Sequence, residues 1–142
     1  MDRVLKFERV SIKDIMVPAE KVVTFPVTAS VDEVIEEANK YSYYRFPVMT
    51  PDGRKVIGII SFFDLLGLDG GERLSKVMHT PLFTRADESA ERLLVRMKRE
   101  SMHMAIVLDG DGNFAGIVTL ENILESIVGN IYSEHEALYL DH

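Results

Sequence analysis

The spacing of apolar and polar positions along the chain predicts short helices and strands in a repeated order. Ser30 and Glu33 have the spacing of a capping box, and the apolar positions after them recur with helical spacing, which predicts a helix that ends near Lys40. A short turn at 12–16, capped by Ser11, precedes it. The rest of the first half is predicted to hold strands at 21–25, 46–49 and 56–61 and a helix at 62–66.

The second half repeats this order. After a turn at 74–78, we predict a strand at 82–84 and a helix that Asp87 caps and that ends near Ser101. Two strands and a final helix follow, at 104–108, 114–119 and 120–132. Each half therefore follows a β-α-β-β-α order. We predict an α+β fold in which two pseudo-twofold-related repeats pack through their sheets, because a half of about 60 residues is marginal alone.

Duplicated positions support this division. Gly58 and Gly116 are 58 positions apart, and so are Ser61 and Thr119. A repeat of this length is a whole supersecondary unit, which favours duplication. The predicted organisation is a lead-in helix or linker, a first repeat, a glycine-rich linker, a second repeat and a C-terminal tail, at 1–9, 10–68, 69–72, 73–132 and 133–142.

Composition narrows the possible functions. The formal net charge of −7 argues against a nucleic-acid surface. The chain has no cysteine, so disulfides, thiol nucleophiles and cysteine-bound zinc are excluded. No apolar run reaches the roughly 18 residues that a membrane span requires. These features are typical of a cytoplasmic protein.

Candidate chemistry lies at the ends of two predicted strands. Ser61 precedes Asp64, and Thr119 precedes Asn122, by three positions each. Such pairs serve as helix caps. The same geometry suits a nucleotide, because a helix N-terminus and a hydroxyl attract phosphate while a carboxylate accepts from ribose hydroxyls. Both interpretations stay open. With neither a nucleophile–base pair nor metal-ligand spacing in the sequence, we predict no enzyme and no metal site.

The repeated unit resembles a tandem pair of cystathionine-β-synthase (CBS) domains, known as a Bateman module. The resemblance covers roughly residues 10–132 and rests on three paired features. These are a methionine shortly before a proline, an apolar strand segment, and a Gly-Ile strand that ends in a hydroxyl residue with Asp or Asn three positions later. They occur at 14–18 and 76–81, at 46–48 and 105–107, and at 58–64 and 116–122.

A narrower resemblance, carried by 13–18, 44–48, 103–107 and 116–131, is to the magnesium/cobalt-efflux and haemolysin C-like family. In that family the CBS pair lies on the cytoplasmic side of a transmembrane domain. The resemblance implies that this chain is either a piece of a longer membrane protein or a stand-alone relative. It also implies a regulatory role, a homodimer and a transporter domain as partner.

Bateman modules bind adenosine nucleotides in two clefts between the repeats. The resemblance implies AMP, ADP or ATP as ligand, the last possibly with Mg²⁺. The first cleft would use residues of both halves, namely Arg45, Pro47, Ser61, Asp64, Thr80, Pro81 and Phe83. The second cleft would use His103, Ala105, Thr119 and Asn122 with Val17, Pro18 and Val22.

The two implied clefts differ at one position. Asn122 stands where the family usually has aspartate, and its amide can accept from one ribose hydroxyl but not both. This departure favours the first cleft, although relatives in the efflux family often use the second. The alternative function is a ligand-free dimerisation module, in which Ser61 and Thr119 only cap helices.

Overall fold

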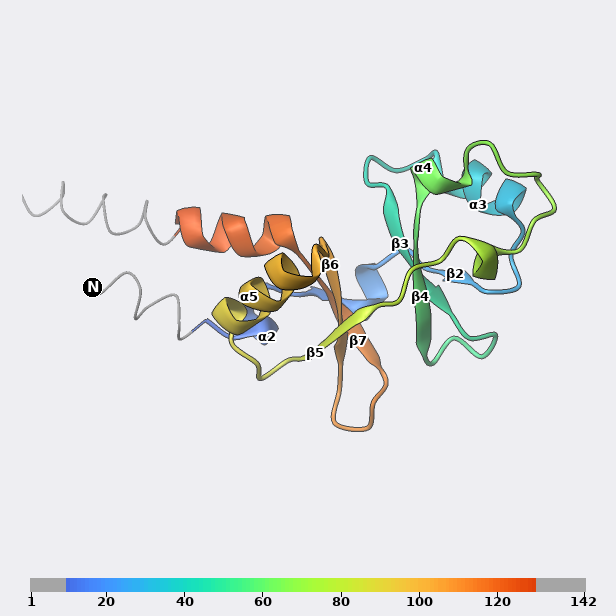
Figure 1. Ribbon diagram of the computed structural model, residues 1–142. Coiled ribbons are helices and arrows are strands. Elements are labelled where there is room, and N and C mark those ends of the chain that lie inside the picture. The colour runs from blue at the N-terminus through green and yellow to red at the C-terminus, as the bar shows by residue number, and fades with distance from the viewer. Residues whose placement is uncertain (1–9, 130–142) are drawn as a thin grey trace, which may run out of the picture.

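The computed structural model describes residues 10–129, which form two halves that face each other through their sheets (Figure 1). One sheet has the strand order β2-β3-β4 and the other the order β1-β7-β6-β5. The strands are β1 (Val17–Pro18), β2 (Phe25–Pro26), β3 (Arg45–Met49), β4 (Val56–Ser61), β5 (Leu82–Arg85), β6 (Met104–Leu108) and β7 (Phe114–Thr119). The predicted two-sheet α+β architecture is confirmed.

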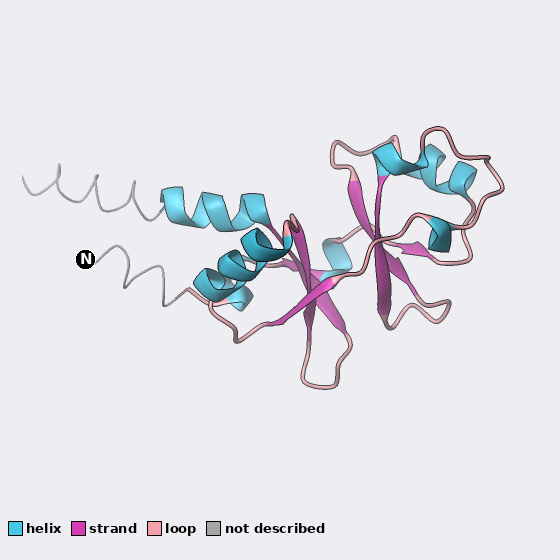
Figure 2. Ribbon diagram, in the orientation of Figure 1, coloured by secondary structure: helices cyan, strands magenta, loops and turns pink. Residues whose placement is uncertain are grey.

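The α-helices lie on the outer side of each sheet (Figure 2). The described helices are α2 (Ile12–Ile15), α3 (Val31–Ala38), α4 (Phe62–Leu65), α5 (Ala90–Glu100) and the helical residues 120–129. Two 3-10 turns accompany them, η1 (Ala19–Lys21) and η2 (Leu74–Lys76). The predicted capping box starts α3, because the Ser30 hydroxyl accepts from the Glu33 N–H at 3.3 Å and the Glu33 carboxylate accepts from the Ser30 N–H at 3.4 Å.

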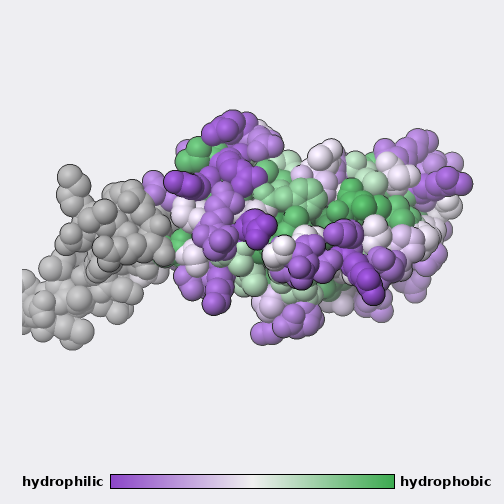
Figure 3. All heavy atoms as spheres, turned by 90° about the horizontal axis from the view of Figure 1, so that it is seen from below, coloured by the Kyte–Doolittle hydropathy of each residue, from purple (hydrophilic) through white to green (hydrophobic). Residues whose placement is uncertain are grey.

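Three apolar clusters hold the molecule together. Two of them lie between a sheet and its helices, one in each half. The third joins the two sheets and consists of Met49, Val56, Ile59, Met104, Ile106 and Ile117. On the face shown in Figure 3, hydrophobic atoms accordingly gather towards the middle of the described part, and hydrophilic atoms dominate its periphery. The halves are thus joined by a core and not only by the segment between them.

Each half also lends a short segment to the sheet of the other half. In β1, Val17 pairs with Ile117 of β7. In the second half, His79 pairs with Ile59 of β4, with backbone hydrogen bonds in both directions at 2.7 and 3.0 Å. Ile59 and Ile117 occupy equivalent positions, 58 residues apart. Val17 and His79 are therefore equivalent by their place in the fold.

This exchange explains the duplicated glycines. A Cβ atom at Gly116 would collide with the backbone carbonyl oxygen of Val17, and one at Gly58 would come within 2.5 Å of the Met78 side chain. Only a residue without a side chain lets the crossing segment approach this closely.

Three predicted elements differ from the structure by more than one residue. The strand predicted at 21–25 is replaced by η1 and by β2, because Val22 donates back to the Ala19 carbonyl and closes a turn. Ser89, not Asp87, caps α5: its hydroxyl accepts from the Arg92 N–H at 3.0 Å, while Asp87 lies in the preceding turn. Helix α3 ends at Ala38 rather than near Lys40. The predicted lead-in at 1–9 and the end of the last helix at 130–132 lie outside the described residues, as does the tail.

We expect Gly116→Ala to destabilise the protein by about 1–3 kcal/mol, because the new methyl group meets backbone that cannot rotate away. Urea unfolding measures the change. Gly110→Ala is the matched control, since nothing lies within 4 Å of a Cβ there. Equal stability of the two variants would contradict the close approach of the exchanged segment.

Candidate functional site

Two cavities are formed by residues of both halves. The larger has a volume of about 520 Å³, and the smaller a volume of about 240 Å³. Binding sites for drug-sized ligands usually measure about 300–1,000 Å³. The larger cavity therefore has room for a small organic ligand, whereas the smaller one falls below that range.

The larger cavity brings together most of the residues implied for the second cleft. These are Val17, Val22, His103, Thr119 and Asn122. Two others do not line it: Pro18 lies in β1 beside them, and Ala105 is fully buried in the core of the second half. Residues far apart in the sequence thus meet at the end of β7, where the final helix begins.

Only two residues implied for the first cleft, Arg45 and Ser61, line the smaller cavity. The remaining ones do not: Pro47, Asp64, Thr80, Pro81 and Phe83. Pro47 is buried within β3, and the carbonyl of Phe83 accepts from the Arg96 guanidinium at 2.6 Å. The cavity volumes point to the second cleft, opposite to the preference that the sequence suggested.

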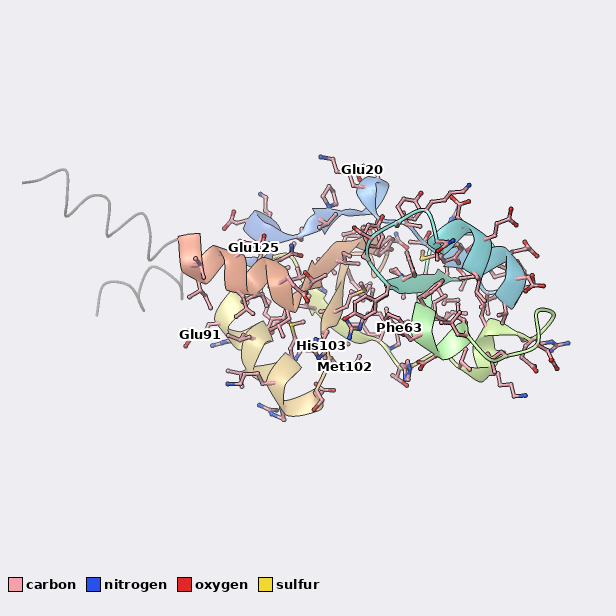
Figure 4. All side chains as sticks on the ribbon, turned by 90° about the horizontal axis from the view of Figure 1, so that it is seen from above. Glu20, Phe63, Glu91, Met102, His103 and Glu125 are labelled. Atoms are coloured by element: carbon pink, nitrogen blue, oxygen red, sulfur yellow. The ribbon has the colours of Figure 1, made fainter. Side chains whose placement is uncertain are left out.

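Arg45 and His103 form a shared wall, since each lines both cavities. They lie 58 positions apart, at the beginning of β3 and directly before β6. In Figure 4, His103 lies beside Met102 where the two halves meet. The Arg45 guanidinium carbon lies 4.5 Å from the centre of the Tyr44 ring, a cation–π arrangement. A fixed positive charge, suited to phosphate, therefore lies between the two cavities.

The sequence interpretation missed an aromatic wall. Tyr43 and Tyr44 line the larger cavity and come from the loop that precedes β3. The Tyr43 ring stacks on Tyr41 at 5.3 Å, and the Tyr44 ring lies 5.2 Å from Phe63. Partial burial raises the pKa of the Tyr43 hydroxyl. The tyrosines clustered before the Arg45–Met49 strand were the available signal.

Two carboxylates also line the larger cavity and were likewise missed. Glu121 and Glu125 lie one turn apart on the final helix, next to Thr119. A polyphosphate that entered this cavity would meet these negative charges as well as the Arg45 guanidinium. Lys21 also lines this cavity.

The two hydroxyl pairs make different contacts. The Thr119 N–H donates to Asn122 Oδ1 at 2.9 Å, and the Asn122 N–H donates to Thr119 Oγ1 at 3.1 Å, which completes a reciprocal cap. Ser61 caps α4 without any side-chain hydrogen bond. Its partner Asp64 instead lies 2.8 Å from the imidazole Nε2 of His79.

Two features are absent from residues 10–129. No helix among them is long and apolar enough to span a membrane. Within the same range, no three side chains of His, Asp and Glu are grouped so that they could hold a metal ion.

These features define a paired module with a ligand-sized cleft between repeats. A family model for the CBS domain matches residues 12–71 and 74–129, so the chain belongs to the CBS domain family. This confirms the resemblance drawn from the paired motifs.

Two relatives are similar to most of this chain. Hemolysin C of Brachyspira hyodysenteriae is 36% identical over 129 residues, which are 89% of this chain and 47% of that protein. The magnesium and cobalt efflux protein CorC of Vibrio cholerae is 31% identical over 140 residues, 96% of this chain and 48% of that protein. The chain thus spans about half the length of these relatives.

Among solved structures, the chain is similar to the CBS domain of the bacterial CNNM/CorC family Mg²⁺ transporter in complex with ATP. The TM-score is 0.85 and the identity 30%, and the match covers 90% of this chain and 94% of that chain. The resemblance to efflux and haemolysin-like proteins is thereby confirmed.

Because Thr119 and Ser61 make different contacts, we expect the removal of their hydroxyls to lower the free energy of unfolding by different amounts. We expect Thr119→Ala to lower the free energy of unfolding by about 0.5–2 kcal/mol, because the Asn122 N–H loses its acceptor. Ser61→Ala should change stability much less, since Ser61 makes no side-chain cap bond. Chemical denaturation of the two variants, each compared with the native chain, measures both changes. A larger loss from Ser61→Ala would contradict the observed contacts.

Proposed function

We propose that this protein is a regulatory module that binds an adenosine nucleotide in the larger cleft. The observation that carries the proposal is the convergence of both halves on one cavity of about 520 Å³, with a hydroxyl, an amide and a cation in its lining. The ATP complex of the 30% identical CBS domain supports the choice of ligand. Two repeats at 10–68 and 73–132, joined by 69–72, remain our proposed organisation.

The chemistry of the lining suggests how the ligand is held. Val22 and the tyrosine rings offer apolar and aromatic surface to the adenine base. Thr119 and Asn122 lie where the final helix begins, and their oxygens can accept from ribose hydroxyls. Arg45 supplies positive charge for the phosphates. Asn122 offers one acceptor where aspartate would offer two, so we expect modest affinity.

Regulation follows from the fact that both halves line the cleft. A ligand that contacts both repeats favours the arrangement in which those contacts are made. It shifts the equilibrium only by the difference between its affinities for the two arrangements. In the proposed whole protein this shift acts on an attached transporter of Mg²⁺ or Co²⁺. We further propose a homodimer that buries exposed apolar side chains of α4, of its C-cap residue and of the final helix, namely Phe63, Leu66, Leu124 and Val128.

One observation favours a second function. The Thr119–Asn122 cap satisfies its own hydrogen bonds without any ligand. In the alternative function, the module only mediates assembly, and its exposed apolar helices carry that role.

Calorimetric titration with AMP and with Mg²⁺-ATP separates the two functions. We expect saturable binding, and we expect Arg45→Gln to weaken it about 10-fold or more, because a charge-assisted bond to phosphate contributes about 1.5–3 kcal/mol. Arg54→Gln is the matched control, since Arg54 is exposed in the β3–β4 turn and lines neither cavity. Absence of binding at millimolar nucleotide would sink the proposal and leave the assembly module.

The two cleft carboxylates predict how binding depends on Mg²⁺. We expect ATP to bind poorly without Mg²⁺, because its phosphates meet Glu121 and Glu125. Replacing both with glutamine should strengthen binding of metal-free ATP while changing that of AMP much less. Titrations in EDTA and in Mg²⁺ measure this difference. Equal effects of the double substitution on both nucleotides would show that the carboxylates do not face the phosphate chain.

A further inference from the structure

The two clefts carry equivalent residues that make different contacts. Asp64 and Asn122 are 58 positions apart and follow equivalent strands. Asn122 bonds within its own cap and lines the larger cavity. Asp64 lies 2.8 Å from His79 Nε2 and does not line the smaller cavity. One oxygen of the carboxylate that could accept hydroxyls in the first cleft, Asp64 Oδ2, is thus already engaged by His79.

His79 is held in place by its backbone. Its N–H and C=O both bond to Ile59 of β4, at 2.7 and 3.0 Å. Its equivalent in the other half is Val17, which pairs with Ile117 and has no side-chain donor. Such a side-chain contact therefore can form in the first cleft and cannot form in the second.

The imidazole also occupies space in the first cleft. His79 lines the smaller cavity together with Ser61 and the shared residues Arg45 and His103. Arg45 and His103, which form the shared wall, remain available to both cavities. The first cleft has the smaller volume, and its Asp64 carboxylate contacts His79 instead of lining the cavity.

We propose that His79 decides which cleft accepts the nucleotide. By donating from Nε2 to Asp64, it competes with a ligand for this carboxylate and favours the second cleft as the binding site. The identity of the ligand rests on the proposed function above. The side chains of His79 and Asp64 are 60% and 46% exposed, so the contact is weak in water and acts by competing with the ligand.

The substitution His79→Val tests this directly, because it copies the equivalent Val17. Backbone amide NMR reports on each cleft separately, with Ile59 and Ser61 in the first and Val22 and Thr119 in the second. With AMP or Mg²⁺-ATP at millimolar concentration, we expect saturable shifts only at Val22 and Thr119 in the native chain. In His79→Val we expect shifts at all four amides, and the calorimetric stoichiometry should rise from one to two.

Two controls complete the experiment. His79→Ala removes the same donor and should give the same gain, which guards against an effect peculiar to valine. His79→Val/Asp64→Ala should lose the gained site, because the released carboxylate is then absent. Saturable shifts at Ile59 and Ser61 in the native chain, or none there in either His79 variant, would overturn the inference. Absence of shifts at Val22 and Thr119 in the native chain would instead reject the proposed function.

Discussion

Six buried apolar side chains between the two sheets hold the halves face to face, and the clefts depend on this contact. Three come from each half, and burial of each contributes about 1.5–3 kcal/mol. Without this layer, neither half would bury the inner face of its sheet. The cavities lie beside this layer, and Met104 belongs both to the layer and to the lining of the two cavities. The surface that lines the cavities thus depends on how the two sheets pack against each other.

The exchange of short segments reinforces this contact. Val17 lies in the sheet of the second half, and His79 bonds to the sheet of the first. Each exchanged segment passes over a glycine, which explains why the glycines recur at the same distance as the hydroxyl residues. The same segments carry residues into the cavities. The exchanged segments therefore contribute both to the stability of the fold and to the lining of the clefts.

Much of the fold could be predicted because local signals agreed with it. The strands 104–108 and 114–119 were predicted with the bounds that the structure shows, since each is an apolar run next to a turn. Prediction failed where two local signals competed. Asp87 and Ser89 are both good caps, and only the turn formed by the Glu88 N–H and the Arg85 carbonyl decides between them. The tyrosine wall was missed because ring stacking brings together side chains whose spacing has no regular period.

The sequence by itself determined the duplication, the α+β class and the equivalence of the two hydroxyl pairs, because these depend on residue type and spacing along one chain. The tertiary structure alone decided the volumes of the two clefts and the partner of Asp64. The contact of Asp64 with His79 joins residues 15 positions apart across the two halves, and the cap of Asn122 on Thr119 is local. Cavity volume and the position of an imidazole depend on the crossing of distant segments, and no spacing rule within one repeat contains that information.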